Sequence, residues 1–141
     1  MMPTMPGDVS TTESAFDGER QVHVDPGWLS KGWEGSSLKL GGFWSEKTPE
    51  VFALEVVYFG VAGIESVQVN VDGEIIELEP ASALTDFDHP HGRVESGRRF
   101  VVPLEFVDRM MEAERVVFRV GLGGTRAEGI FSTNAPTTAR P

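Results

Sequence analysis

The sequence predicts a mainly β protein, an antiparallel β-sandwich of about seven strands with one short amphipathic helix. Three observations support this class: apolar and polar residues alternate in several short segments, turn residues separate these segments, and one segment has helical spacing. The clearest segment is ESVQVNVDGEIIELEP, in which every second residue from Val67 to Val71 is valine. This period of two is typical of a strand with one buried face.

A β-hairpin is predicted around Asp72-Gly73, a pair suited to the left-handed dihedrals of a type I′ turn. A two-residue turn at this position pairs Val69 with Ile76, so that both apolar side chains lie on one face. Pro80 is expected to stop the returning strand, because proline has no N–H to donate.

Six further segments read as strands, and segment 50–60 is apolar on both sides over much of its length, as in a central strand covered on both faces. The six segments are 20–25, 37–45, 50–60, 98–102, 115–124 and 125–132.

One helix is predicted near residues 103–113, where Pro103 suits the first helical position. Leu104, Val107 and Met111 fall at helical spacing and are expected to face a sheet. Phe106 and Met110 share the same spacing.

A single domain is predicted over residues 20–132, between a flexible acidic tail at 1–19 and a second flexible tail at 133–141. The formal charge of −10 disfavours nucleic acid as a partner, because both carry negative charge. No apolar run reaches the length of a transmembrane helix, and the absence of cysteine excludes disulfides and thiolate chemistry.

The stretch TDFDHPHGR, from Thr85 to Arg93, contains four potential metal ligands, which are Asp86, Asp88, His89 and His91. A metal site needs three or four converging ligands, with His23 as a candidate from elsewhere. A metal-dependent hydrolase around His89 and His91 is therefore one alternative. The other two alternatives are a polar connecting loop, which implies no cofactor, and a contact with a partner.

The three tryptophans, Trp28, Trp33 and Trp44, cluster in the first third of the chain. They fill the core or stack against saccharide rings, so a carbohydrate-binding sandwich is a second alternative. Further along, GLGGTR lacks the spacing of a nucleotide-binding loop and is expected to form a tight turn. It closes a region, Arg93 to Arg126, that contains seven arginines and no lysine.

The segment RRFVVPLEFVDRMMEAERVVFRVGLGG combines a strand, a short helix and the pattern A-x-x-V-x-x-R-V at Ala113, Val116, Arg119 and Val120. In this layout the C-terminal half resembles small exported β-rich proteins and lipoproteins of bacteria that have no assigned function. The resemblance implies a non-catalytic binding or structural module of the cell envelope, with a protein or an envelope component as partner. The expected location is the periplasm or the outer-membrane surface if an export signal has been removed, and otherwise the cytoplasm.

Overall fold

The computed structural model describes residues 9–31, 34–81, 85–88 and 94–131. Within these ranges the fold is mostly β with one short helix, as predicted, and all strand pairings are antiparallel. The strands are β1 (Val9–Glu13), β2 (Arg20–Lys31), β3 (Glu34–Ser45), β4 (Val51–Phe59), β5 (Ile64–Val71), β6 (Glu74–Glu77), β7 (Glu79–Pro80), β8 (Asp86–Asp88), β9 (Glu95–Pro103), β10 (Val116–Leu122) and β11 (Thr125–Phe131), and the helix is α1 (Leu104–Glu112).

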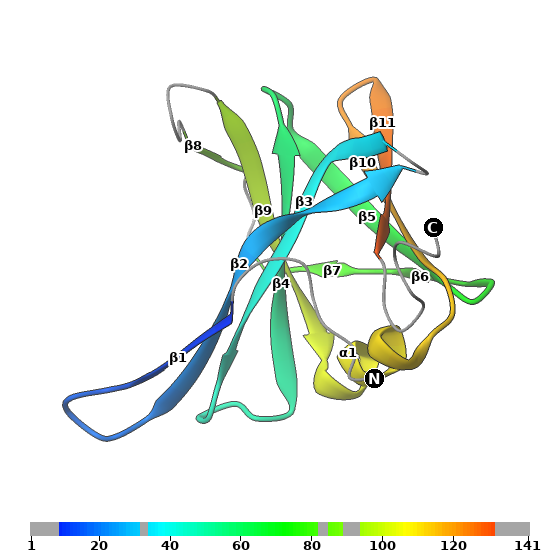
Figure 1. Cartoon of the computed structure of the whole chain (residues 1–141). Coiled ribbons are helices and arrows are strands. Elements are labelled where there is room, and N and C mark those ends of the chain that lie inside the picture. The colour runs from blue at the N-terminus through cyan, green and yellow to red at the C-terminus, as the bar shows by residue number, and fades with distance from the viewer. Residues whose placement is uncertain (1–8, 32–33, 82–84, 89–93, 132–141) are drawn as a thin grey trace.

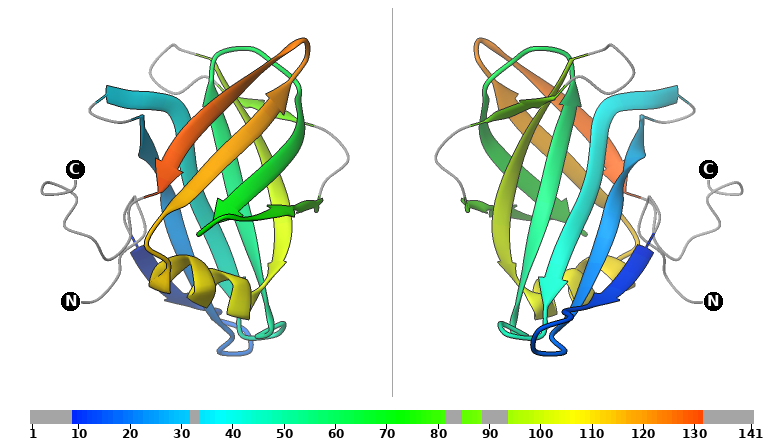
Figure 2. Two further views of the ribbon diagram at one scale, coloured as in Figure 1. Left: turned by 90° about the vertical axis from the view of Figure 1, so that its right-hand side faces the viewer. Right: turned by 90° about the vertical axis from the view of Figure 1, so that its left-hand side faces the viewer.

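The strands form two layers that face each other across the core (Figure 2). Their hydrogen-bonded order is β6-β5-β10-β11-β2-β3-β4-β9-β7, with β1 added beside β2 and β8 beside β9. One layer holds β5, β6, β10 and β11, and the other holds β2, β3, β4 and β9 (Figure 1). Among the described residues, one pair, Ile130 with Ser30, joins β11 to β2. The two layers are therefore connected sparsely along this side.

On the opposite side, residues 74–81 join the two ends of the strand order. The Leu78 N–H donates to the Val67 carbonyl of β5 at 2.9 Å, whereas the Ala81 N–H donates to the Arg99 carbonyl of β9 at 2.8 Å. The returning strand β6 ends earlier than predicted, at Glu77, and the chain then changes partner, so that Pro80, opposite Phe100, is the last residue of β7. Proline fits there because the flanking Ala81 supplies the hydrogen bond.

The β5–β6 hairpin has the predicted turn and register. Asp72 and Gly73 have φ values of 50° and 98°, the left-handed conformation that a type I′ turn requires. Val69 lies opposite Ile76. The side chain of Asp72 also accepts hydrogen bonds from the backbone N–H groups of Glu114 and Arg115, at 3.2 and 2.8 Å. The turn is thereby tied to the chain that leads from α1 into β10.

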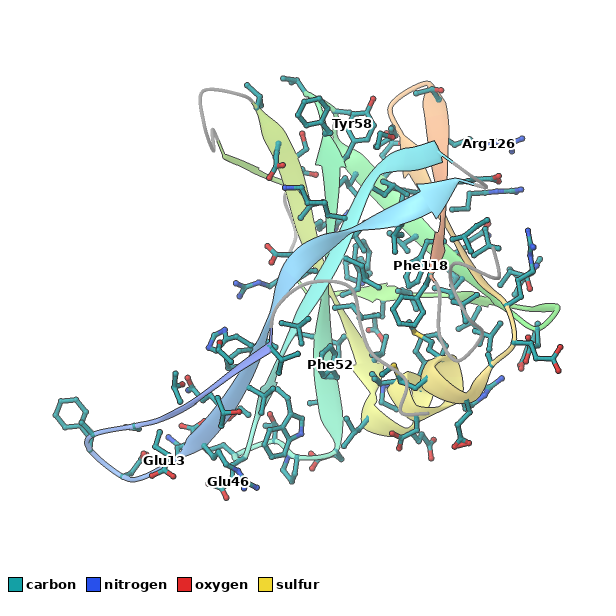
Figure 3. The ribbon with its side chains drawn as sticks, in the orientation of Figure 1. Glu13, Glu46, Phe52, Tyr58, Phe118 and Arg126 are labelled. Atoms are coloured by element: carbon teal, nitrogen blue, oxygen red, sulfur yellow. The ribbon has the colours of Figure 1, made fainter. Side chains whose placement is uncertain are left out.

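The core lies between the layers, and the inward position of Phe52 and Phe118 is visible in Figure 3. Helix α1 covers one end of the sandwich (Figure 2). Its most buried residues are Phe106, Val107 and Met110, whereas Leu104 and Met111 are only partly buried. The buried face is therefore rotated from the predicted one, and the first residue of the helix is held by a hydrogen bond from the Leu104 N–H to the Glu50 carbonyl.

Three strands lie outside the predicted set: β1, β7 and β8. Strand β1 falls within the segment predicted as a tail, and it pairs with β2 from Val9 opposite Val24 to Glu13 opposite Arg20. Strand β2 also continues beyond its predicted end, past a register shift between Val24 and Gly27. None of the helices in the described residues is long and apolar enough to cross a membrane.

Candidate interaction site at the hairpin tip

The hairpin formed by β1 and β2 projects from the body of the sandwich, at the lower left of Figure 1. All five residues of β1 are exposed. At the turn, Phe16 has a relative exposure of 101%, so none of its ring is covered. An aromatic side chain of this size usually buries most of its surface, which makes its position here unusual.

Hydrogen bonds give this turn a defined shape. The Ser14 N–H donates to the Glu19 carbonyl at 2.8 Å, and the Gly18 N–H donates to the Ser14 carbonyl at 2.9 Å. The Phe16 N–H donates to Ser14 Oγ at 3.2 Å, and the Glu19 N–H donates to Asp17 Oδ1 at 2.9 Å. Phe16 is therefore presented on an ordered turn.

Lys47, from the β3–β4 turn, forms exposed ion pairs with two carboxylates of the hairpin turn. Its Nζ lies 3.2 Å from Asp17 Oδ2 and 3.3 Å from Glu19 Oε1. The Glu19 N–H and then Lys47 lower the pKa of Asp17, and the Ser45 hydroxyl is the main cause of the lowered pKa of Glu19. The two carboxylates in turn raise the pKa of Lys47, with Asp17 as the larger cause.

Trp44, the tryptophan whose side chain the structure describes, lies on β3 opposite Val22 of the hairpin. Its indole N–H donates to the Pro49 carbonyl at 3.0 Å, and the Arg20 guanidinium lies 5.9 Å from the ring centroid. Trp44 is partly buried against the core. The ring face and the N–H of Trp44 are therefore already engaged in contacts within the protein. The side chain of Trp28 and all of Trp33 lie outside the described residues.

The surface around the tip is acidic. Glu13 and Glu46 lie at this end of the molecule (Figure 3), together with Asp17 and Glu19. Lys47 is exposed and already shared between two of the carboxylates. This site combines a fully exposed aromatic ring with the carboxylates of Glu13, Asp17 and Glu19 on the same turn, and we call it the hairpin tip (residues 13–19).

The predicted metal ligands are only partly described. Asp86 and Asp88 belong to β8, whose backbone pairs with β9, but their side chains lie outside the described residues, as do His89 and His91. His23 is exposed and packs edge-on against Phe43, with ring centroids 4.7 Å apart. The described part of the chain contains no group of three metal-ligating side chains.

A second feature, on the outer face of β5, β10 and β11, is a polar hollow of about 540 Å³. The predicted GLGGTR turn forms part of it and has the expected conformation, with Gly124 at φ 83°. The lining residues are Glu65, Ser66, Gln68, Arg119, Gly121, Leu122, Gly124, Thr125 and Arg126. The sequence signal for this hollow is the arginine-rich region that ends at Arg126.

Comparisons with protein-family models, with curated proteins and with solved structures found no match.

Proposed function

We propose that this chain is a non-catalytic protein-binding module that contacts its partner through the hairpin tip. The observation that carries the proposal is the complete exposure of Phe16 on a hydrogen-bonded turn. Burying an exposed phenylalanine contributes about 1.5–3 kcal/mol. Because the turn is already ordered, association sacrifices little conformational freedom there.

The partner should offer an apolar pocket with basic residues around its rim. The pocket accommodates the Phe16 ring, and basic side chains pair with Glu13 and Glu46 beside it. Aromatic anchors of this kind are frequent among the residues that dominate binding energy. Complementary charge at the rim mainly raises the association rate, which should therefore fall as salt is added.

We also propose that the protein acts in the bacterial cell envelope. The support is the strand–helix–strand layout of the C-terminal half, in which α1 directly follows β9 and precedes β10. Fractionation of cells that produce the protein from its natural gene tests the location. Recovery in the cytoplasm alone would contradict it.

Site-specific photocrosslinking tests the interaction. A benzophenone amino acid replaces Phe16 in one version of the chain and Ile75 in another, since Ile75 is 65% exposed on a different hairpin. We expect one defined adduct from position 16 in the producing cells and none from position 75. Equal adducts from both positions, or none from position 16, would contradict the proposal.

The identified partner then allows a quantitative measurement. Phe16→Ala should weaken its binding at least tenfold, whereas Ile75→Ala should leave the dissociation constant unchanged. Matched far-UV circular dichroism spectra of both variants establish that the fold is intact.

A further inference from the structure

We propose that the polar hollow on the outer face of β5, β10 and β11 binds a small molecule through a single carboxylate group, held between Arg119 and Arg126. This surface is separate from the hairpin tip, and the inference does not depend on the function proposed for the tip.

Gly121 lines the hollow from β10, the middle strand of the three, and adds no side chain to it. Its cross-strand partners are Ser66 on β5 and Arg126 on β11, so all three positions face outward. A Cβ atom at Gly121 would lie 2.5 Å from Ser66 Oγ, which is closer than such atoms approach. The Ser66 hydroxyl therefore lies directly over Gly121, and Arg126 on the neighbouring strand lines the same hollow.

A β-bulge adds a further polar group to the rim. Gly121 pairs with Ser66, but Leu122 pairs with Ile64, so Glu65 is an extra residue in β5. Bulges of this type redirect side chains and are frequent beside binding sites. Both Glu65 and Ser66 consequently line the hollow.

The two arginines are prepared for an anion in different ways. Glu128 accepts a hydrogen bond from Arg119 Nε at 2.7 Å, which orients the guanidinium and leaves its terminal nitrogens for a ligand. Arg126, at the edge of the molecule in Figure 3, forms no ion pair with any described residue. Two planar guanidinium groups on one face suit a carboxylate, which accepts paired hydrogen bonds.

The surrounding charge favours a monoanion. Glu65 and Glu128 lie beside the arginines, and the whole chain has a formal charge of −10, so a phosphate dianion is repelled more strongly than a carboxylate. Ser66, Gln68 and Thr125 provide hydrogen-bonding groups for the rest of the ligand. A carboxylate that also carries hydroxyl or amide groups, such as an acidic sugar or a peptide C terminus, fits this lining.

An NMR titration of the full chain tests the inference with four probes. Glucuronate and N-acetylalanine carry the carboxylate, and glucose and N-acetylalaninamide are their neutral counterparts. We expect saturable shifts of the Gly121, Gly124 and Arg126 amide signals with at least one of the carboxylates and none with its neutral counterpart. The carboxylate that binds more tightly distinguishes the sugar source from the peptide source. Because the hollow is open to solvent, the expected dissociation constant is on the order of 1 mM.

Arg119→Gln and Arg126→Gln should each weaken binding at least tenfold. Arg115→Gln, which changes an exposed arginine just before the same strand, should leave binding unchanged. Equal shifts from the neutral probes, retained binding in both hollow variants, tighter binding of inorganic phosphate, or no saturable shift up to about 50 mM would overturn the inference.

Discussion

At the scale of single residues, the two residues of the β5–β6 turn have distinct roles. Gly73 supplies a left-handed conformation, and nothing lies within 4 Å of the position where its Cβ would be, so backbone strain alone opposes a side chain there. Asp72 is the other left-handed residue, and its carboxylate also accepts hydrogen bonds from the backbone N–H groups of Glu114 and Arg115, which follow α1. The sequence predicted the first role from the Asp-Gly pair, whereas the second depends on tertiary structure.

Gly73→Ala should therefore destabilise the protein by about 1–2 kcal/mol, the usual cost of a left-handed non-glycine residue. Gly63→Ala is the matched control, because Gly63 also has open space around it but no positive φ. Urea unfolding measures both. Equal stability of the two variants would contradict the role of backbone conformation at Gly73.

Ser96 is the buried polar residue within the described ranges, and it orders the chain between β4 and β5. Its hydroxyl donates to the Gly60 carbonyl at 2.6 Å and accepts from the Ala62 N–H at 3.1 Å. Ser96→Ala leaves both backbone groups without this partner and should cost about 1–3 kcal/mol. Thermal unfolding measures the loss, with Ser10→Ala on exposed β1 as the control, and a loss no larger than that of the control would count against this role.

At the scale of elements, the sequence was most informative where a structure is set by local pattern. The β5–β6 hairpin and the existence of α1 follow from spacing and turn chemistry within about 16 residues. Strand β1 has no buried residue and thus no apolar alternation to reveal it. The hairpin tip was missed for the same reason, since composition placed Phe16 in a flexible tail.

The hollow was missed because it depends on tertiary structure. The hollow requires a particular register of three strands and a bulge at Glu65. No local pattern in the sequence predicts either of them. Only the glycines of GLGGTR and the arginines before Arg126 indicated that this region was distinctive.

The orientation of α1 predicts how much its individual residues contribute to the stability of the protein. Met110→Ala should cost about 2–5 kcal/mol, because the side chain is fully buried beneath the two layers. Leu104→Ala should cost less, since Leu104 is only partly buried, and Asp108→Ala on the exposed face is the control. Urea unfolding should rank the three variants in this order, and a larger loss at Leu104 than at Met110 would contradict the observed rotation.

The stability of the hairpin tip should depend on pH. The folded-state pKa values of Asp17 and Glu19 are lowered, so their stabilising contribution is present above the ordinary carboxyl pKa of about 4 and is lost as pH falls through the lowered values. The pKa of Lys47 is raised, so its contribution is present below about pH 10 and is lost as pH rises through the raised value.

Amide hydrogen exchange of Phe16 and Gly18 measures this dependence. Protection, after correction for the intrinsic effect of pH, should be constant near neutral pH and fall on strong acidification. Lys47→Ala should raise the carboxyl pKa values and move the acid transition to higher pH. An unchanged transition in this variant would contradict the role of the ion pairs.

At the scale of the whole molecule, neither layer is expected to unfold independently of the other. Residues 74–81 hydrogen-bond to β5 in one layer and to β9 in the other, and β11 pairs with β2. The two layers are therefore linked on both sides of the core. Urea unfolding should therefore give the same midpoint by far-UV circular dichroism and by tryptophan fluorescence. Leu78→Ala should lower both midpoints together, and separated midpoints would show that the layers unfold independently.

The position of β11 also determines when the chain is able to fold during its synthesis. The meander of β2, β3 and β4 leaves the ribosome early, but β2 receives its pairing partner across the layers only when Ile130 has emerged. Strand β5 likewise waits for β10, which follows it by more than 40 residues. The nascent chain therefore carries unpaired strand edges until residue 130 has emerged, and unpaired edges of this kind are the sites at which unfinished chains aggregate.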